Sequence, residues 1–85
     1  MNPAAKPPDA STYSGRFAAR LRQLREQTGM TGQEAVAAIN AAGFQVKQTT
    51  YYNWESGRSE PPLNAVPAIA QALGLKSVRV LFPVR

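Results

Sequence analysis

Apolar residues recur at helical spacing in several separate segments of this 85-residue chain, which predicts an all-α fold. The first segment carries a stripe at i, i+4, i+7 and i+11 with one alanine beside it: Phe17, Leu21, Leu24, Thr28 and Ala18. We therefore expect a helix over residues 15–28, with Ser14 as its N-cap and Gly29 as its stop.

Arg25 falls inside this apolar stripe. A guanidinium turned toward a core must pair with a carboxylate, or its burial carries a large desolvation cost. The alternative is that Arg25 lays its aliphatic stem along the helix and keeps its charge in water. The pattern alone leaves both interpretations open.

The second helical segment opens with a capping box of the form T-x-x-E, made by Thr31 and Glu34. Its apolar face is narrow and consists of small or medium side chains: Ala35, Val36, Ala38, Ile39 and Ala42. Gly43 is the predicted C′ residue that ends the helix. Phe44 and Val46 follow, and we expect them to fill the core between this helix and the next.

The third segment, residues 48–58, reads QTTYYNWESGR. As a helix over residues 48–56, closed by Gly57, it places Tyr51, Trp54 and Glu55 on one side. Its other face and flanks carry amides, hydroxyls and one aromatic ring, with no carboxylate: Gln48, Thr49, Tyr52, Asn53 and Ser56. Such side chains are typical of surfaces that read base edges in a DNA groove, whereas the alternative is an ordinary solvated helix face.

Two prolines after Arg58 prevent the third helix from continuing. We expect a fourth helix capped by Asn64, with Pro67 in its first turn and a buried face of Val66, Ile69, Ala70 and Leu73. A last short helix over residues 78–82 follows the cap Ser77, and its Val78, Leu81 and Phe82 complete the predicted core.

Residues 1–13 are predicted to be a flexible tail, with Lys6 as its one cation, and residues 14–85 are predicted to be the folded domain.

The composition of the chain favours some classes of function and argues against others. The chain has 10 Lys+Arg against 5 Asp+Glu, a formal net charge of +5, which favours a polyanionic partner over an acidic one. Because histidine and cysteine are both absent, we predict no enzyme, no catalytic residue, no metal site, no cofactor and no small-molecule substrate. No apolar run is long enough to span a bilayer, so we expect a soluble, cytoplasmic protein without a membrane partner.

A capped helix, an apolar-anchored turn and a second helix with a polar outer face form the order of a helix-turn-helix. In that motif the first helix braces against the DNA backbone and the second enters the major groove. The alternative is a helical hairpin in a small bundle, and the spacing alone does not separate the two.

The sequence resembles the Cro/repressor type of helix-turn-helix domain, also called Xre-like or lambda-repressor-like. Five pieces carry the resemblance: LRQLREQTGMT, QEAVAAI, VKQTTYYNWESG, the following RSEPP, and AIAQALGL. They extend over roughly residues 16–82. The resemblance implies a compact five-helix bundle that binds double-stranded operator DNA, commonly as a two-fold homodimer.

Residue by residue, the resemblance implies base reading by Gln48, Thr49 and Asn53, with Thr50 and Tyr52 beside them. It implies phosphate contacts for Lys47, Ser56 and Arg58, and for a glutamine at the start of the second helix, which here is Gln33. It also implies a structural ion pair between Arg25 and Glu55, which we prefer to an Arg25 extended into water.

Two departures from the family are visible. The family often begins its second helix with Thr-Gln, whereas here Thr31 is followed by Gly32 and the glutamine moves to Gln33. The turn is also expanded, because six residues lie between Ile39 and Val46 where the family typically has about one. Either a longer second helix or a looser loop accommodates them, and the family does not predict the angle of the third helix.

Two functions of different class follow. The first is a sequence-specific transcriptional regulator of the phage or bacterial repressor kind, in which helix 48–56 reads the major groove. The second is a helical protein-interaction or antitoxin-like module that anchors a partner through a patch of Tyr51, Tyr52, Trp54 and Phe44.

Overall fold

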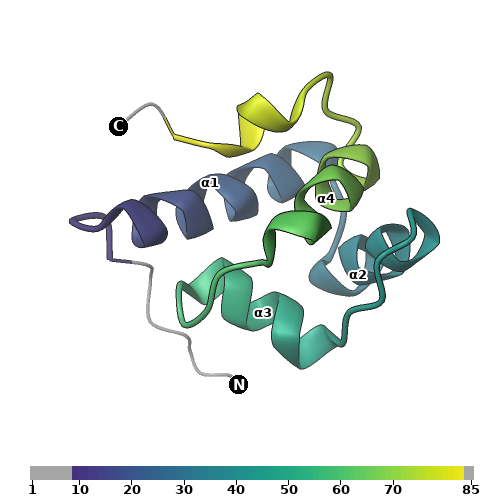
Figure 1. Cartoon of the computed structure of the whole chain (residues 1–85), viewed down its shortest axis with the longest axis horizontal. Helices are drawn as coiled ribbons and strands as arrows, with labels where there is room; N and C mark the ends of the chain where they lie inside the picture. The colour runs from purple at the N-terminus through teal and green to yellow at the C-terminus, as the bar shows by residue number, and fades with distance from the viewer. Residues whose placement is uncertain (1–8, 84–85) are drawn as a thin grey trace.

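The computed structural model describes residues 9–83, which contain helices and no strand (Figure 1). Its α-helices within that range are α1 (Tyr13–Thr28), α2 (Gly32–Ala41), α3 (Gln48–Ser56) and α4 (Val66–Ala72). Two short 3-10 helices, η1 (Leu63–Ala65) and η2 (Val78–Leu81), precede and follow α4. Most of the predicted tail, including Lys6, lies outside the described residues, as do residues 84–85.

The predicted all-α class is confirmed for these residues, but the count of five α-helices is not. Where a fifth α-helix was expected over residues 78–82, the chain forms the four-residue 3-10 helix η2. Ser77 does cap it, since its side chain accepts a hydrogen bond from the Arg79 amide at 3.1 Å. With Pro83 next in the chain, the segment is too short for the repeated i to i+4 bonds that stabilise an α-helix.

The start of α1 differs from the prediction by two residues. Thr12, not Ser14, is the N-cap, and its hydroxyl accepts a hydrogen bond from the Gly15 amide at 2.9 Å. Ser14 lies in the first helical turn, where its hydroxyl donates to the carboxylate of Glu60. At the other end of the helix, Thr28 is exposed rather than part of the buried stripe, and its hydroxyl donates a hydrogen bond to the Arg25 carbonyl at 2.6 Å.

The entry into α4 also differs from the prediction. Asn64 is not an N-cap but an exposed residue inside η1, which begins after Pro62 and continues directly into α4. Pro67 does lie in the first turn of α4, and the buried face of this helix is the predicted one with Ala68 added. In η2, Val78 is 38% exposed and stays outside the core, whereas Leu81 is fully buried. Phe82, which follows η2 and was also predicted to complete the core, is 37% exposed.

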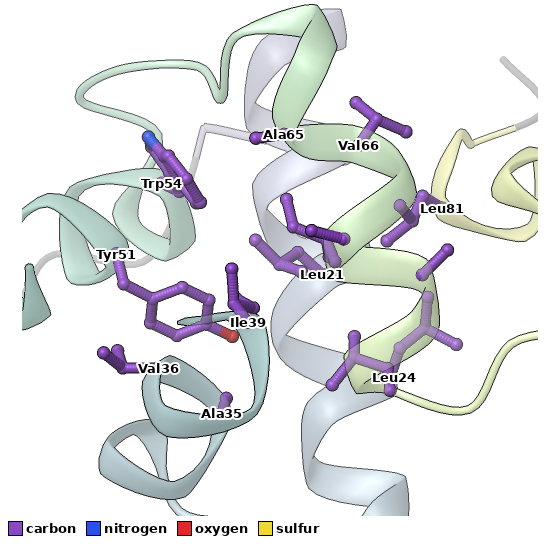
Figure 2. Packing of buried hydrophobic residues seen from close by; sticks show 14 of the residues in the cluster. Leu21, Leu24, Ala35, Val36, Ile39, Tyr51, Trp54, Ala65, Val66 and Leu81 are labelled. Atoms are coloured by element: carbon purple, nitrogen blue, oxygen red, sulfur yellow. The ribbon is translucent and has the colours of Figure 1, made fainter. Parts of the chain in front are cut away.

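The core lies where all four α-helices meet η2 (Figure 2). Leu21 of α1, Ile39 of α2, Tyr51 of α3, Ile69 of α4 and Leu81 of η2 are its largest fully buried side chains. Helix α3 packs against both α1 and α2, and α4 also packs against α2. This arrangement buries one face of α3 and leaves the opposite face open.

The expanded turn between α2 and α3 begins with a Schellman motif. The Phe44 amide bonds the Ile39 carbonyl at 3.3 Å, the Gly43 amide bonds the Asn40 carbonyl at 3.1 Å, and Gly43 has φ 109°. The predicted stop at Gly43 is therefore confirmed, and the capping box at the start of α2 is also present. The extra residues are shared between a helix that continues to Ala41 and a connection over residues 42–47.

Candidate functional site

Helix α3 has one face that docks against the rest of the protein. Tyr51 is fully buried, Trp54 is 2% exposed and Glu55 is 6% exposed, as their positions in the sequence predicted. The Trp54 ring meets Tyr51 edge-on with centroids 6.0 Å apart, and it meets Phe44 of the preceding turn at 6.3 Å. Figure 2 shows the Tyr51 ring reaching from α3 over Val36 and Ile39 of α2.

The carboxylate of Glu55 ties this face to α1. Arg25 Nε lies 2.5 Å from Glu55 Oε2 and Arg25 Nη2 lies 3.0 Å from Oε1, so the contact is bidentate. Arg25 Nη1 donates to the Met30 carbonyl at 2.9 Å, and the Tyr51 hydroxyl donates to Glu55 Oε2 at 2.5 Å. Arg25 therefore does not extend into water, and the buried charge of Glu55 is neutralised and hydrogen-bonded.

Two pKa shifts follow from this cluster. Hydrogen bonding to the Glu55 carboxylate raises the pKa of the Arg25 guanidinium above its ordinary value, against an opposing effect of burial. Burial, and then the hydrogen bond and negative charge of Glu55, raise the pKa of the Tyr51 phenol well above its ordinary value. Both shifts keep Arg25 charged and Tyr51 protonated, and these are the states that the hydrogen bonds require.

The opposite face of α3 is open to solvent. Gln48, Thr49, Thr50 and Tyr52 are exposed, and Asn53 is half-buried at the edge of this face. We call these five residues the outer face of α3. Within residues 9–83, the hydroxyls of Thr49 and Thr50 and the amide of Asn53 have no hydrogen-bond partner, so their polar groups are available to a ligand.

Tyr52 differs from its neighbours on the outer face, because its ring lies against another element. A β-carbon built on Gly32, the first residue of α2, would come within 2.4 Å of Tyr52 Cε1 and 2.5 Å of its hydroxyl oxygen. Gln48 Nε2 donates to the same hydroxyl at 3.3 Å. Sequence reasoning missed this contact, although Gly32 is one of the two places where the sequence departs from the family that it resembles.

The candidate phosphate-contacting residues lie at the ends of the helices. Lys47 is the exposed N-cap residue of α3, and Arg58 is exposed two residues beyond its last turn. Gln33 is exposed in the first turn of α2. Ser56 is half-buried and its hydroxyl donates to the Asn53 carbonyl at 3.1 Å, so it is less available than the other three.

Asn40 is a second residue that sequence reasoning missed. Its side-chain oxygen accepts a hydrogen bond from the Val46 amide at 2.8 Å and so closes the turn between α2 and α3. Phe44 and Val46 are half-buried and pack against the core, as predicted. Together these contacts determine where α3 begins and in which direction it leaves the turn.

The aromatic patch that a protein-interaction module would need is not formed. Of its four proposed members, Tyr51 and Trp54 are core residues and Phe44 is half-buried against Trp54. Only Tyr52 presents a large exposed area, at 43%. This correction follows from the docking of α3, which turns Tyr51 and Trp54 inward, and from the packing of Phe44 against Trp54.

A separate hollow of about 320 Å³ lies between the start of α1, the segment after α3 and the end of η2. Its walls are mainly apolar and include Tyr13, Phe17, Leu63 and Phe82.

Among residues 9–83 there is no cluster of three or more potential metal ligands. Within the same residues, no helix is long and apolar enough to cross a membrane.

Comparison with known proteins identifies one family. The family model described as "Helix-turn-helix domain" matches residues 16–81, which include all four α-helices except the first residues of α1. No curated protein and no solved structure matches the chain.

Proposed function

The chain belongs to the helix-turn-helix domain family, and from this premise we propose that it is a sequence-specific, double-stranded DNA-binding transcriptional regulator. More specifically, the proposed regulator is a repressor of the phage or bacterial kind that acts in the cytoplasm. The observation that carries the proposal is the division of α3 into two faces. One is pinned to α1 and α2 by Glu55 and two aromatic rings, and the other is open, polar and free of charge.

In the proposed mechanism, α3 enters the major groove with its outer face toward the base edges. The amides of Gln48 and Asn53 can each form a bidentate pair with adenine, and threonine can present a hydroxyl or place its methyl against that of thymine. Because the outer face carries no carboxylate, it approaches the groove without repulsion from the phosphates on either side.

Lys47, Arg58 and Gln33 set the register on the phosphate backbone. Lys47 and Arg58 stand beyond the two ends of α3, and Gln33 begins α2. Contacts of this kind supply affinity without sequence information and release counterions, so they make binding depend strongly on salt. Repression follows if the bound protein, as a homodimer on a two-fold operator, occludes polymerase.

The proposal is tested by selecting bound sequences from random duplex DNA and measuring affinity for the selected site by fluorescence anisotropy over a series of salt concentrations. We expect an enriched motif whose affinity falls steeply with salt, by more than tenfold between about 50 and 200 mM for several phosphate contacts. A two-fold symmetric motif would support the dimer. Failure to enrich any motif, with weak binding to all duplexes, would contradict sequence-specific recognition.

A further inference from the structure

Tyr52 and Gly32 fit together across the gap between α3 and α2. The phenol ring occupies the space that a side chain at residue 32 would fill, with Cε1, Cζ and the hydroxyl oxygen at 2.4, 2.7 and 2.5 Å from the position of a β-carbon. The ring also meets the buried Tyr51 ring in an edge-type arrangement at 6.1 Å between centroids. Although Tyr52 is 43% exposed, its ring therefore packs against two neighbouring residues.

The hydroxyl at the tip of this ring accepts a hydrogen bond from Gln48 Nε2 at 3.3 Å. We propose that Tyr52 is a positioning residue, which orients the Gln48 amide for its base pair through this bond and contacts no base itself. The proposal rests on the proposed function, and it reassigns Tyr52 from base reading to the support of a base-reading neighbour.

The chemistry of the amide makes this role specific. A glutamine amide has two N–H donors and one carbonyl oxygen, and a bidentate pair with adenine uses one donor and the oxygen. The second N–H of the amide is not used in this pair, and it can donate a hydrogen bond to the Tyr52 hydroxyl. The bond therefore selects the amide orientation in which the oxygen and the remaining N–H point away from the tyrosine.

Gly32 makes this arrangement possible for a steric reason. Its φ is not in the left-handed region, so its backbone conformation is open to other residues. Any other side chain, however, would displace the Tyr52 ring and with it the hydroxyl that holds Gln48. Gly32 thus leaves the space that the Tyr52 ring needs to hold Gln48, although it lies on a different helix and 16 positions before Gln48 in the sequence.

The test compares sequence selections from random duplex DNA for the wild-type protein and for Gln48→Ala, Tyr52→Phe and Gly32→Ala. Gln48→Ala identifies the base pair that Gln48 reads, as the position at which preference is lost. Tyr52→Phe keeps the ring and removes only the hydroxyl. We expect it to reduce the preference at that same position by roughly threefold to tenfold, the value of one hydrogen bond, and to leave the other positions unchanged.

Gly32→Ala should weaken preference at the same position, because it moves the ring. In a Tyr52→Ala background the further change Gly32→Ala should have no effect on preference, since no ring remains to be displaced. Proton NMR of the free protein adds a readout that needs no DNA. The α-proton signals of Gly32 should carry a ring-current shift that Tyr52→Phe retains and Tyr52→Ala removes.

The outcomes separate this inference from the proposed function. If the wild-type protein selects no motif, both fail. If it selects a motif that Tyr52→Phe leaves unchanged while Gln48→Ala alters it, only the positioning role fails. If Tyr52→Phe instead loses preference at a base pair that Gln48→Ala does not affect, Tyr52 reads a base directly and the inference is overturned.

Discussion

At the scale of single residues, the Glu55 carboxylate joins three parts of the fold. It accepts two hydrogen bonds from Arg25 of α1 and one from Tyr51 of its own helix, and Arg25 also holds the Met30 carbonyl before α2. A buried ion pair is weak evidence for stability, because its formation is offset by desolvation. Removing one partner of the pair is destabilising, because the other charge is then left buried and unpaired.

Arg25→Ala should therefore lower the free energy of unfolding by about 3 kcal/mol or more. The matched control is Arg22→Ala on the same helix, which breaks the pair with Glu26 at 3.3 Å between side chains that are 51% and 56% exposed. That change should cost less than about 1 kcal/mol. Urea unfolding of both variants measures the difference, and equal losses would mean that the Glu55 cluster does not hold α3.

The raised pKa of Tyr51 predicts a loss of stability at high pH. Below its ordinary pKa of 10.0 the phenol is protonated in both the folded and unfolded chains, and its contribution is fully present. Above that pH the unfolded chain releases the proton first, so stability falls by up to about 1.4 kcal/mol per pH unit from this one group.

Urea unfolding between pH 8 and pH 11 measures this effect, with Tyr51→Phe as the comparison. The variant starts less stable, because Glu55 loses a donor, but its stability should fall less steeply above pH 10. Parallel pH profiles for the two proteins would show that Tyr51 does not titrate differently in the folded state.

Residue roles were predictable from the sequence where they depend on helical spacing alone. Tyr51, Trp54 and Glu55 share one side of α3 by periodicity, whereas the pattern left Arg25 either paired or extended into water, and the pair with Glu55 followed only from the family resemblance. The contact between Tyr52 and Gly32 was not predictable in this way. It depends on the crossing of two helices, which no period within one helix describes.

At the scale of elements, the connection over residues 42–47 positions α3 relative to α2. Its beginning was predictable, because a glycine after an apolar helical stripe is typical of a C′ residue and Gly43 has φ 109°. Its closure was not, since the bond from the Val46 amide reaches back six positions to the side chain of Asn40 in the last turn of α2. The 3-10 form of η1 and η2 was likewise not indicated by apolar spacing.

Gly43→Ala should destabilise the protein by about 1–2 kcal/mol, since an L-residue is strained at this positive φ. Beyond the two adjacent residues, no atom of the described chain lies within 4 Å of the added β-carbon, so a clash with another part of the fold is not the cause. Gln45→Ala, an exposed change in the same connection, is the control and should be nearly neutral. Thermal unfolding compares the two, and an unaffected Gly43→Ala protein would exclude strain at this turn.

At the scale of the whole molecule, a net charge of +5 favours a polyanion, but the positions of the cations decide which surface meets it. Lys47 and Arg58 lie at the ends of α3, whereas Arg79 lies on η2, which packs against α1 and α4. The fold class and the family were predictable from the motifs and their order. The angle of α3 was not, because the expanded turn departs from the family.

Arg58→Ala should lower the slope of log affinity against log salt by roughly 1, the signature of one lost phosphate contact. Arg79→Ala removes the same formal charge from a surface away from α3 and should leave the slope nearly unchanged. Fluorescence anisotropy with one duplex at several salt concentrations provides both slopes. Equal slopes for the two variants would assign the effect to net charge rather than to a contact.

The central claim, that the outer face of α3 reads DNA, is tested most directly by the affinity of Asn53→Ala for the selected duplex and for a scrambled one. We predict a loss of about 1–3 kcal/mol in the preference for the selected duplex. The free energy of unfolding, measured by thermal unfolding, should stay within about 0.5 kcal/mol of the wild-type value. The reason is that the Asn53 side chain makes no hydrogen bond within the described residues that the substitution could remove. Gln71→Ala, an exposed amide on α4, is the control and should change neither quantity. An Asn53→Ala protein that keeps its fold and its full preference for the selected duplex would contradict the claim.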